Sequence, residues 1–177
     1  QVLYAFNFSV RAIYMMGRFI SFIAALVVFW LGTGFATAEA DDVPQARTLQ
    51  VYKSATCGCC QEWMAHMQAN AFKLSGNNLA SLTQFKLRHG IELRYQSCHT
   101  ALSPSGFVFE GHIPARFVSQ FLAEPTSEAI GLAVPGMPVG SPGMEVGNKF
   151  MPYQVLLLKR DGNHEIYADV RRREQQY

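Results

Sequence analysis

Three of the four cysteines in this 177-residue chain are crowded into the segment Cys57-Gly58-Cys59-Cys60. The alternating residues Leu49–Tyr52 before this segment predict a short strand, and the apolar spacing over Cys60–Ala71 predicts a helix. The thiols therefore stand at a helix N-terminus, where unpaired N–H groups and the positive end of the helix dipole favour thiolate over thiol. Because thiolate is the form that attacks disulfides and binds metal ions, the cluster predicts a chemical site at a strand-to-helix turn.

Three interpretations of this cluster compete. In the first, the four cysteines of an exported protein form two structural disulfides, but a vicinal bridge between Cys59 and Cys60 would strain the backbone. In the second, Cys57 and Cys60 are a C-x-x-C redox pair on the first turn of a helix. In the third, all three thiols are soft ligands for Cu(I) or a similar ion. Cys59 favours the third, because a redox pair has no use for a thiol between its members.

The segment before the predicted domain has the pattern of a secretory signal peptide. An arginine precedes the apolar run Phe19–Leu31, and small residues follow up to a cleavage site after Ala38 or Ala40. We therefore expect residues 1–40 to be an unplaced N-terminal stretch plus a signal peptide, and residues 41–177 to form a single periplasmic domain. If the peptide is retained instead, its uncharged stretch would anchor the chain in a membrane. Export places the thiols in an oxidising compartment, where they need a metal, a reductase or a partner thiol.

The charge balance argues against nucleic acid as a partner. The formal net charge is only +2, and the basic run Arg171–Arg173 is most simply a solvated tail. The part of the chain after the signal peptide is long enough for one ordinary hydrophobic core and too short for two. The sequence therefore predicts one domain.

The order of the predicted elements indicates an α/β fold. The sequence patterns predict strand Leu49–Tyr52, helix Cys60–Ala71, strand Phe72–Leu74, helix Leu79–His89, strands Thr100–Leu102 and Phe107–Glu110, and a helix opened by Pro114. A strand, a crossover helix and a parallel strand, followed by a helix and a hairpin, is the thioredoxin-like arrangement. We therefore expect a thioredoxin-like βαβαββα core with the cysteine cluster after its first strand.

A Pro/Gly/Met-rich extension follows the predicted core. The alternating prolines and glycines of Gly131–Glu145 predict one irregular loop, because proline fixes the backbone and glycine frees it. Met137 and Met144 lie in this loop and are either thioether ligands beside the thiolates or apolar plugs. A final strand over Tyr153–Leu158 and a hairpin partner over Glu165–Ala168 are expected to end the domain.

Four motifs together resemble a bacterial family, domain of unknown function 411, which includes the CopG-type proteins of copper-resistance operons. The motifs are Cys57-Gly58-Cys59-Cys60 after a strand, Ser97-Cys98-His99-Thr100-Ala101, Glu110-Gly111-His112-Ile113-Pro114-Ala115, and the run P-G-M-P-x-G-S-P-G-M-E from Pro135. The resemblance covers the chain from about Thr48 to Tyr167. It implies a thioredoxin-like, exported protein of copper or silver handling, whose CxCC and CH motifs hold Cu(I).

We therefore expect a periplasmic copper-binding protein of metal resistance. Its candidate metal ligands are Cys57, Cys59, Cys60, Cys98 and His99, with Met137 and Met144 as additions. Closely spaced thiolates favour bridging, so we expect more than one Cu(I) ion and take interconversion of Cu(I) and Cu(II) as a hypothesis. Other periplasmic copper-handling proteins are the expected protein partners. The alternative function, a thiol–disulfide oxidoreductase using Cys57 and Cys60, stays open.

The expected fold also predicts where Cys98 lies. In a thioredoxin-like sheet the loop entering the third strand lies against the cysteine turn, and Cys98-His99 falls in that loop. We expect sulfur–sulfur separations of roughly 3.5–4.5 Å between Cys98 and the turn, since metal–sulfur bonds are about 2.3 Å long. Oxidation of the metal-free protein should then link Cys98 to one of the three clustered cysteines. His112 is expected to hydrogen-bond beside the site or to cap the helix at Pro114, not to be a ligand.

Overall fold

The computed structural model describes residues 47–177. The predicted signal peptide and its cleavage site, together with the expected start of the domain at residue 41, lie outside the described residues. Over 47–177, none of the helices has both the length and the apolar character needed to cross a membrane.

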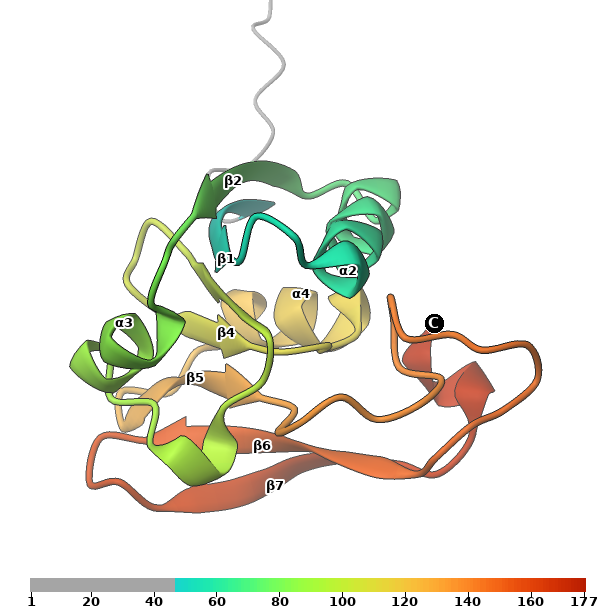
Figure 1. The fold of residues 1–177 in the computed structure, drawn as a ribbon. Helices are drawn as coiled ribbons and strands as arrows, with labels where there is room; N and C mark the ends of the chain where they lie inside the picture. Colours follow the sequence, from blue (N-terminus) through green and yellow to red (C-terminus); the bar gives the residue numbers. More distant parts are fainter. Residues whose placement is uncertain (1–46) are drawn as a thin grey trace, which may run out of the picture. The chain divides into compact units, whose positions relative to one another are not determined.

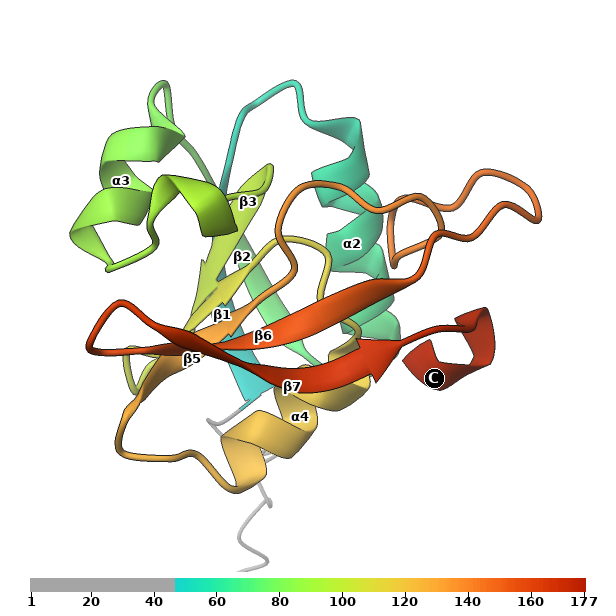
Figure 2. The same ribbon diagram turned by 90° about the horizontal axis from the view of Figure 1, so that it is seen from below.

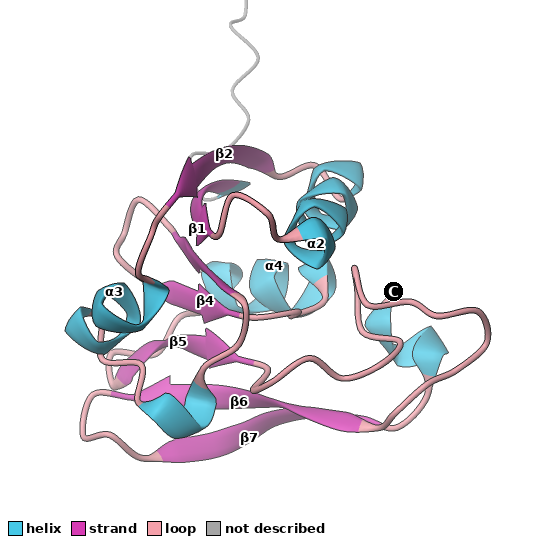
Figure 3. Cartoon of the chain, in the orientation of Figure 1, coloured by secondary structure: helices cyan, strands magenta, loops and turns pink. Residues whose placement is uncertain are grey.

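Seven strands of the described residues form one mixed sheet in the order β2-β1-β3-β4-β5-β6-β7. The strands are β1 (Thr48–Lys53), β2 (Lys73–Asn78), β3 (His99–Leu102), β4 (Val108–Glu110), β5 (Ala129–Ala133), β6 (Tyr153–Lys159) and β7 (His164–Val170). Strand β1 pairs with β2 in parallel, and β4 with β5, whereas the other neighbours are antiparallel. Helices follow β1, β2 and the β3–β4 hairpin, whereas after α4 the chain consists mainly of strand and loop (Figure 3).

The helices cover both faces of the sheet. They are α2 (Gly58–Ala69), α3 (Leu82–Arg88) and α4 (Ala115–Ala123), with short 3₁₀ helices at Leu93–Tyr95 and Arg173–Gln176. Helices α2 and α4 lie on one side of the sheet and α3 on the other (Figures 1 and 2). Side-chain alternation in β1 explains this division, because Val51 joins the core with α2 and α4 whereas the ring of Tyr52 stacks 4.2 Å from that of Phe85 in α3.

The main core lies between the sheet and the α2–α4 layer. Its buried members include Leu49, Val51, Trp63, Met67, Phe109, Phe117, Val118, Phe121 and Leu132. Trp63 also donates its indole N–H to the carbonyl of Ile113 over 2.9 Å. Because this bond joins α2 to the turn before α4, the helix that carries the cysteines is held in a fixed position over the sheet.

The described elements confirm the predicted mixed α/β class, and their order up to α4 is the expected βαβαββα. Helix α3 begins at Leu82 instead of the expected Leu79, and two assignments of residues to loops were wrong. Strand β2 continues to Asn78 because Gly76, Asn77 and Asn78 pair with β1, although their composition predicted a loop. Strand β5 includes Gly131–Ala133, which were assigned to the irregular extension. At Gly131 an added Cβ would lie 1.8 Å from the carbonyl oxygen of Val108, so this glycine permits the pairing of β4 with β5.

The Pro/Gly-rich loop between β5 and β6 packs on the start of α2. Gly143 has a φ of +82°, and an added Cβ would lie 2.8 Å from the carbonyl oxygen of Cys59 and 2.6 Å from the amide nitrogen of Trp63. Only a residue without a side chain fits this close approach of two backbones. The loop is therefore held against the turn that carries the thiols.

We predict that Gly143→Ala lowers the free energy of unfolding by more than the about 1–2 kcal/mol that a left-handed backbone costs a non-glycine residue. Gly147→Ala is the matched control, because Gly147 also has a positive φ, +54°, but has no atom within 4 Å of its added Cβ. Urea unfolding of both variants measures the difference. Equal losses would show that the contact with α2 contributes nothing.

Candidate metal centre

The antiparallel pairing of β1 with β3 brings two cysteine-bearing segments to one end of the sheet. Lys53, the last residue of β1, lies opposite His99, the first residue of β3. The chain leaves β1 through a turn in which the Cys57 N–H donates to the Ser54 carbonyl over 3.2 Å, and α2 then begins at Gly58. Cys98 directly precedes β3, so it faces the first turn of α2.

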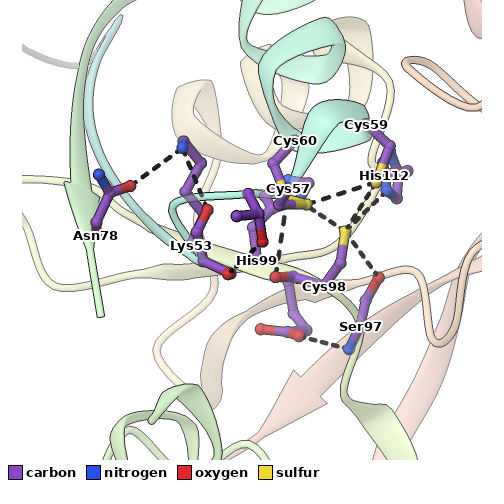
Figure 4. Close-up of a disulfide and its surroundings, with 12 residues drawn as sticks. Lys53, Cys57, Cys59, Cys60, Asn78, Ser97, Cys98, His99 and His112 are labelled. Atoms are coloured by element: carbon purple, nitrogen blue, oxygen red, sulfur yellow. Dashed lines mark hydrogen bonds between the residues drawn. A yellow bond between two sulfur atoms is a disulfide. The ribbon is translucent and has the colours of Figure 1, made fainter. Parts of the chain in front are cut away.

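The four cysteine sulfurs form one group (Figure 4). Cys59 Sγ lies 3.5 Å from Cys57 Sγ and 3.8 Å from Cys98 Sγ. All four sulfur atoms lie within 4.8 Å of one another. The expected convergence of Cys98 with the clustered cysteines is thus observed, although the ligand roles of these residues stay predictions.

A disulfide joins Cys57 to Cys60, while Cys59 and Cys98 carry free thiols. A bridge from Cys98 to the cluster after oxidation stays a prediction, whereas the bridge in the structure is the C-x-x-C pairing of the redox interpretation. The reason is local: the first turn of α2 brings the Cα atoms of Cys57 and Cys60 to 5.4 Å, a separation that suits a disulfide. Because a disulfide sulfur is not a thiolate, this pair must be reduced before it can bind a soft metal ion through thiolates.

A second group of possible ligands shares Cys98 with the first. Cys98 Sγ lies 3.3 Å from His99 Nδ1 and 3.0 Å from His112 Nε2. The other ring nitrogen of His112, Nδ1, lies 2.8 Å from the Pro142 carbonyl and can only donate to it. This bond places the proton on Nδ1 and turns the Nε2 lone pair towards the sulfur, as in metal-bound histidines held by a carbonyl.

His99 is held by packing. Its side chain is fully buried, and its ring centroid lies 4.3 Å from that of Trp63 and 5.1 Å from that of His112. Within residues 47–177, its Nε2 atom is buried without a hydrogen-bond partner. A buried nitrogen with no partner is costly, so a second polar or metal partner at this atom would stabilise the fold.

The sequence predicted that His112 would hydrogen-bond beside the site or cap the helix at Pro114, and its contact with Cys98 confirms the first alternative. The structure places it beside Cys98 because the short hairpin of β3 and β4 returns the chain to the end of the sheet where β3 began. The available signal was the spacing of 14 residues between two cysteine- and histidine-bearing motifs on either side of a predicted hairpin. That signal does not fix the direction of the ring, which depends on the distant Pro142.

Burial decides the charge of the groups in the site. It lowers the pKa of His99 well below its usual value, and the neighbouring His112 and Lys86 lower it further. Burial also lowers the pKa of His112, although the bond to Pro142 opposes the shift. It raises the pKa of Cys98 to about 12, and the charge of Cys59 adds to the effect. In the metal-free protein at neutral pH the histidines are therefore neutral lone-pair donors and Cys98 is a thiol.

The two candidate methionines lie on the Pro/Gly-rich loop. Met137 is 52% exposed, whereas Met144 is half-buried, and the Met144 N–H donates to the Ser141 carbonyl over 2.8 Å. The same loop supplies the Pro142 carbonyl to His112. The predicted role of either thioether as a ligand stays a prediction.

Comparison with known proteins adds to this geometry. A family model described as "Protein of unknown function, DUF411" matches residues 95–144, the segment that contains Cys98, His99 and His112. Two solved structures, of copper resistance protein CopG in Form 1 and Form 2, are each 39% identical to this chain with a TM-score of 0.65. Each covers 69% of this chain, and the match spans 95% and 96% of their own chains. Among curated proteins, no sequence matches.

The raised pKa of Cys98 predicts how the thiol reacts. With its pKa at about 12, alkylation by iodoacetamide in the folded, metal-free protein should keep accelerating as the pH rises past 9. In urea the rate should level off once the pH exceeds the ordinary cysteine pKa of about 8.5. At pH 8 we expect the folded protein to react at least roughly a hundredfold more slowly at this residue than the unfolded chain does.

Peptide mapping of the alkylated protein measures the rate at Cys98 alone. The pKa of Cys98 is higher in the folded state than in the unfolded state. Its stabilising contribution to the free energy of unfolding is therefore fully present below the unfolded pKa and declines as the pH rises towards about 12. Coincident rate profiles in the folded and unfolded states would contradict the burial argument.

Proposed function

This chain belongs to the CopG-type family of copper resistance proteins, and we propose that it binds copper as Cu(I) through its cysteine and histidine cluster. The observation that carries the proposal is the mutual approach of four cysteine sulfurs within 4.8 Å. Thiolates are the soft ligands that select Cu(I), and no carboxylate belongs to either candidate ligand group of the described residues.

The proposed ligands are Cys57, Cys59, Cys60 and Cys98 in their reduced forms. Four thiolates around one singly charged ion would leave a large negative charge in a partly buried site. Sharing the sulfurs between several Cu(I) ions lowers that charge, so we propose a thiolate-bridged group of more than one ion. The separations of 3.5 and 3.8 Å at Cys59 support this arrangement, because one ion can touch two sulfurs at such distances.

Histidine nitrogens complete the proposed site. His99 and His112 both approach Cys98 Sγ, and burial keeps both rings neutral. Imidazole binds both oxidation states of copper, so these nitrogens suit an ion that alternates between Cu(I) and Cu(II). Met137 and Met144 remain proposed additional ligands from the loop beside the site.

The cellular setting is part of the same proposal. We propose a periplasmic protein, exported by the segment before residue 41, that takes up copper or silver ions and exchanges them with other copper-handling proteins. We also propose that its fold is thioredoxin-like. The parallel β1-α2-β2 unit, the β3–β4 hairpin and the position of the C-x-x-C pair after β1 support this assignment.

One observation favours the alternative of a thiol–disulfide oxidoreductase. The Cys57–Cys60 pair forms a disulfide on the first turn of α2, with the free thiol of Cys59 beside it. In that mechanism Cys57 would attack a substrate disulfide and Cys60 would resolve the mixed disulfide. Cys59, Cys98 and the two histidines would then have no assigned role.

The variant Cys59→Ser separates the two functions. If the site binds copper, this change should lower both the bound copper per chain and the Cu(I) affinity, by more than about tenfold. Insulin-reduction activity, which needs only Cys57 and Cys60, should stay near its wild-type level. The reciprocal control is Cys60→Ser, which abolishes any activity of the redox pair but leaves three thiols. Unchanged copper content in Cys59→Ser, together with strong reductase activity, would favour the oxidoreductase.

Copper loading should also depend on the redox state of the Cys57–Cys60 pair. The disulfide-bonded protein should bind less Cu(I) per chain than protein that was reduced and then freed of reductant under anaerobic conditions, because two of the four thiolates are missing. Metal analysis by mass spectrometry of both preparations gives the two stoichiometries. Equal stoichiometries would exclude Cys57 and Cys60 as ligands.

A further inference from the structure

A buried ion pair lies beneath the Cys98 turn. Lys86 of α3 and Glu110 of β4 form a salt bridge with side chains that are only 2% and 0% exposed. Neither residue belongs to the candidate ligand groups. Removing two charges from water costs several kcal/mol per ion, so a buried pair is weak as a source of stability. The role of the pair is therefore better sought in the residues that it holds in place.

The pair holds the residues on both sides of Cys98 and His99. Lys86 Nζ donates to the Ser97 carbonyl over 2.6 Å. Glu110 Oε1 accepts the Ser97 N–H over 2.6 Å, and its Oε2 accepts the Thr100 hydroxyl over 2.5 Å. Both backbone polar groups of Ser97 are thus bound by charged side chains, which make stronger bonds than neutral groups do.

Cys98 lies one residue outside the sheet, so the strand pairing does not hold its backbone and the bonds to Ser97 have to do so. The pairing of β1 with β3 stops at Lys53 and His99, and the pairing of β3 with β4 stops at Thr100 and Glu110. Beyond Glu110 the chain turns away at Gly111, whose φ is +78°. The Ser97 N–H therefore has a side-chain acceptor, the Glu110 carboxylate, and not a carbonyl of β4.

The side chain of Ser97 is held as well. An added Cβ at Gly111 would lie 2.6 Å from Ser97 Cβ, so the two segments are in close contact. The Ser97 hydroxyl donates to the Gly136 carbonyl of the Pro/Gly-rich loop. Ser97 is therefore fixed at its N–H, its carbonyl and its side chain, directly before the cysteine.

From these contacts we infer that Lys86 and Glu110 are positioning residues for the copper site, which hold Cys98 and His99 in reach of Cys59 and His112. This inference rests on the proposed function for its ligand, copper. The fixed turn keeps Cys98 Sγ at 3.8 Å from Cys59 Sγ and 3.0 Å from His112 Nε2, so that little rearrangement is needed when an ion binds. Loss of groups that orient metal ligands typically lowers affinity by about 10–100-fold.

The test compares Lys86→Met with the double variant Lys86→Met/Glu110→Leu. The single change leaves a buried carboxylate without its partner and should destabilise the protein strongly. The double change replaces the pair by apolar groups of similar size and should restore much of the thermal stability. Cu(I) affinity, measured anaerobically by competition with a chromogenic chelator, should stay about 10–100-fold below wild type in both variants. Recovery of affinity together with stability would overturn the inference.

Two further variants keep the test decisive. Val155→Ala removes core volume in β6, away from the turn, and should lower stability while leaving Cu(I) affinity unchanged. Thr100→Val deletes one hydrogen bond to Glu110 without disturbing the charges, so it decides the outcome if the double variant does not fold. We expect Thr100→Val to weaken Cu(I) binding several-fold, and an unchanged affinity would contradict the inference.

A copper-independent measurement separates this inference from the proposed function. Amide hydrogen exchange at Ser97 in the metal-free protein should be faster in the double variant, because the N–H has lost its carboxylate acceptor. If the wild type takes up no copper, the proposed function fails, while the exchange rate still tests whether the Lys86–Glu110 pair holds Ser97 in place. If the wild type binds copper but exchange at Ser97 and Cu(I) affinity are unchanged in the double variant, only the inference fails.

Discussion

The antiparallel pairing of β1 with β3 is the constraint on which the candidate metal centre depends. It sets Lys53 opposite His99, so the turn after β1 and the turn before β3 meet at one end of the sheet. Helix α2 begins a few residues beyond β1, and the β3–β4 hairpin returns His112 to the same end. Cysteines and histidines from three distant segments therefore converge on positions defined by the sheet and by one helix start, which gives a site little freedom to change shape.

Burial gives this site two stable chemical forms. Thiolates are costly in a partly desolvated place, as the raised pKa of Cys98 shows, and the neutral histidines add no positive charge to offset them. Without metal the sulfurs remain as thiols or as the Cys57–Cys60 disulfide. A soft cation would remove the cost by replacing the protons, so the proposed uptake of Cu(I) would be coupled to release of protons. The same sulfurs thus link metal binding to redox state, which explains why two functions compete for one cluster.

Local patterns in the sequence were enough to predict the element order up to α4 and the place of the thiols, because these depend on periodicity and turn residues. The convergence of Cys98 with the thiols followed from the fold that this order indicated. Strand β5 was missed because Gly131 looks like a loop residue, whereas in the sheet it permits a close approach to Val108. The sequence placed His112 beside the site but left the direction of its ring open, because that direction depends on Pro142, 30 residues away. The pairing in the structure, Cys57 with Cys60, is the one that the redox interpretation of the sequence offered.

The Pro/Gly-rich loop contributes to the site mainly through its backbone. Its sequence drew attention to the methionines, yet its observed contacts with and around the site are made by backbone: the Pro142 carbonyl on His112, the Gly136 carbonyl on Ser97 and the approach of Gly143 to Cys59. A carbonyl that accepts from Nδ1 decides which nitrogen of His112 carries the proton, and hence that Nε2 faces Cys98. Glycine is required at position 143 because the chain lies directly on the N-terminus of α2 there, immediately after the carbonyl that reaches the buried ring. The loop therefore determines how a ligand from another part of the chain is presented.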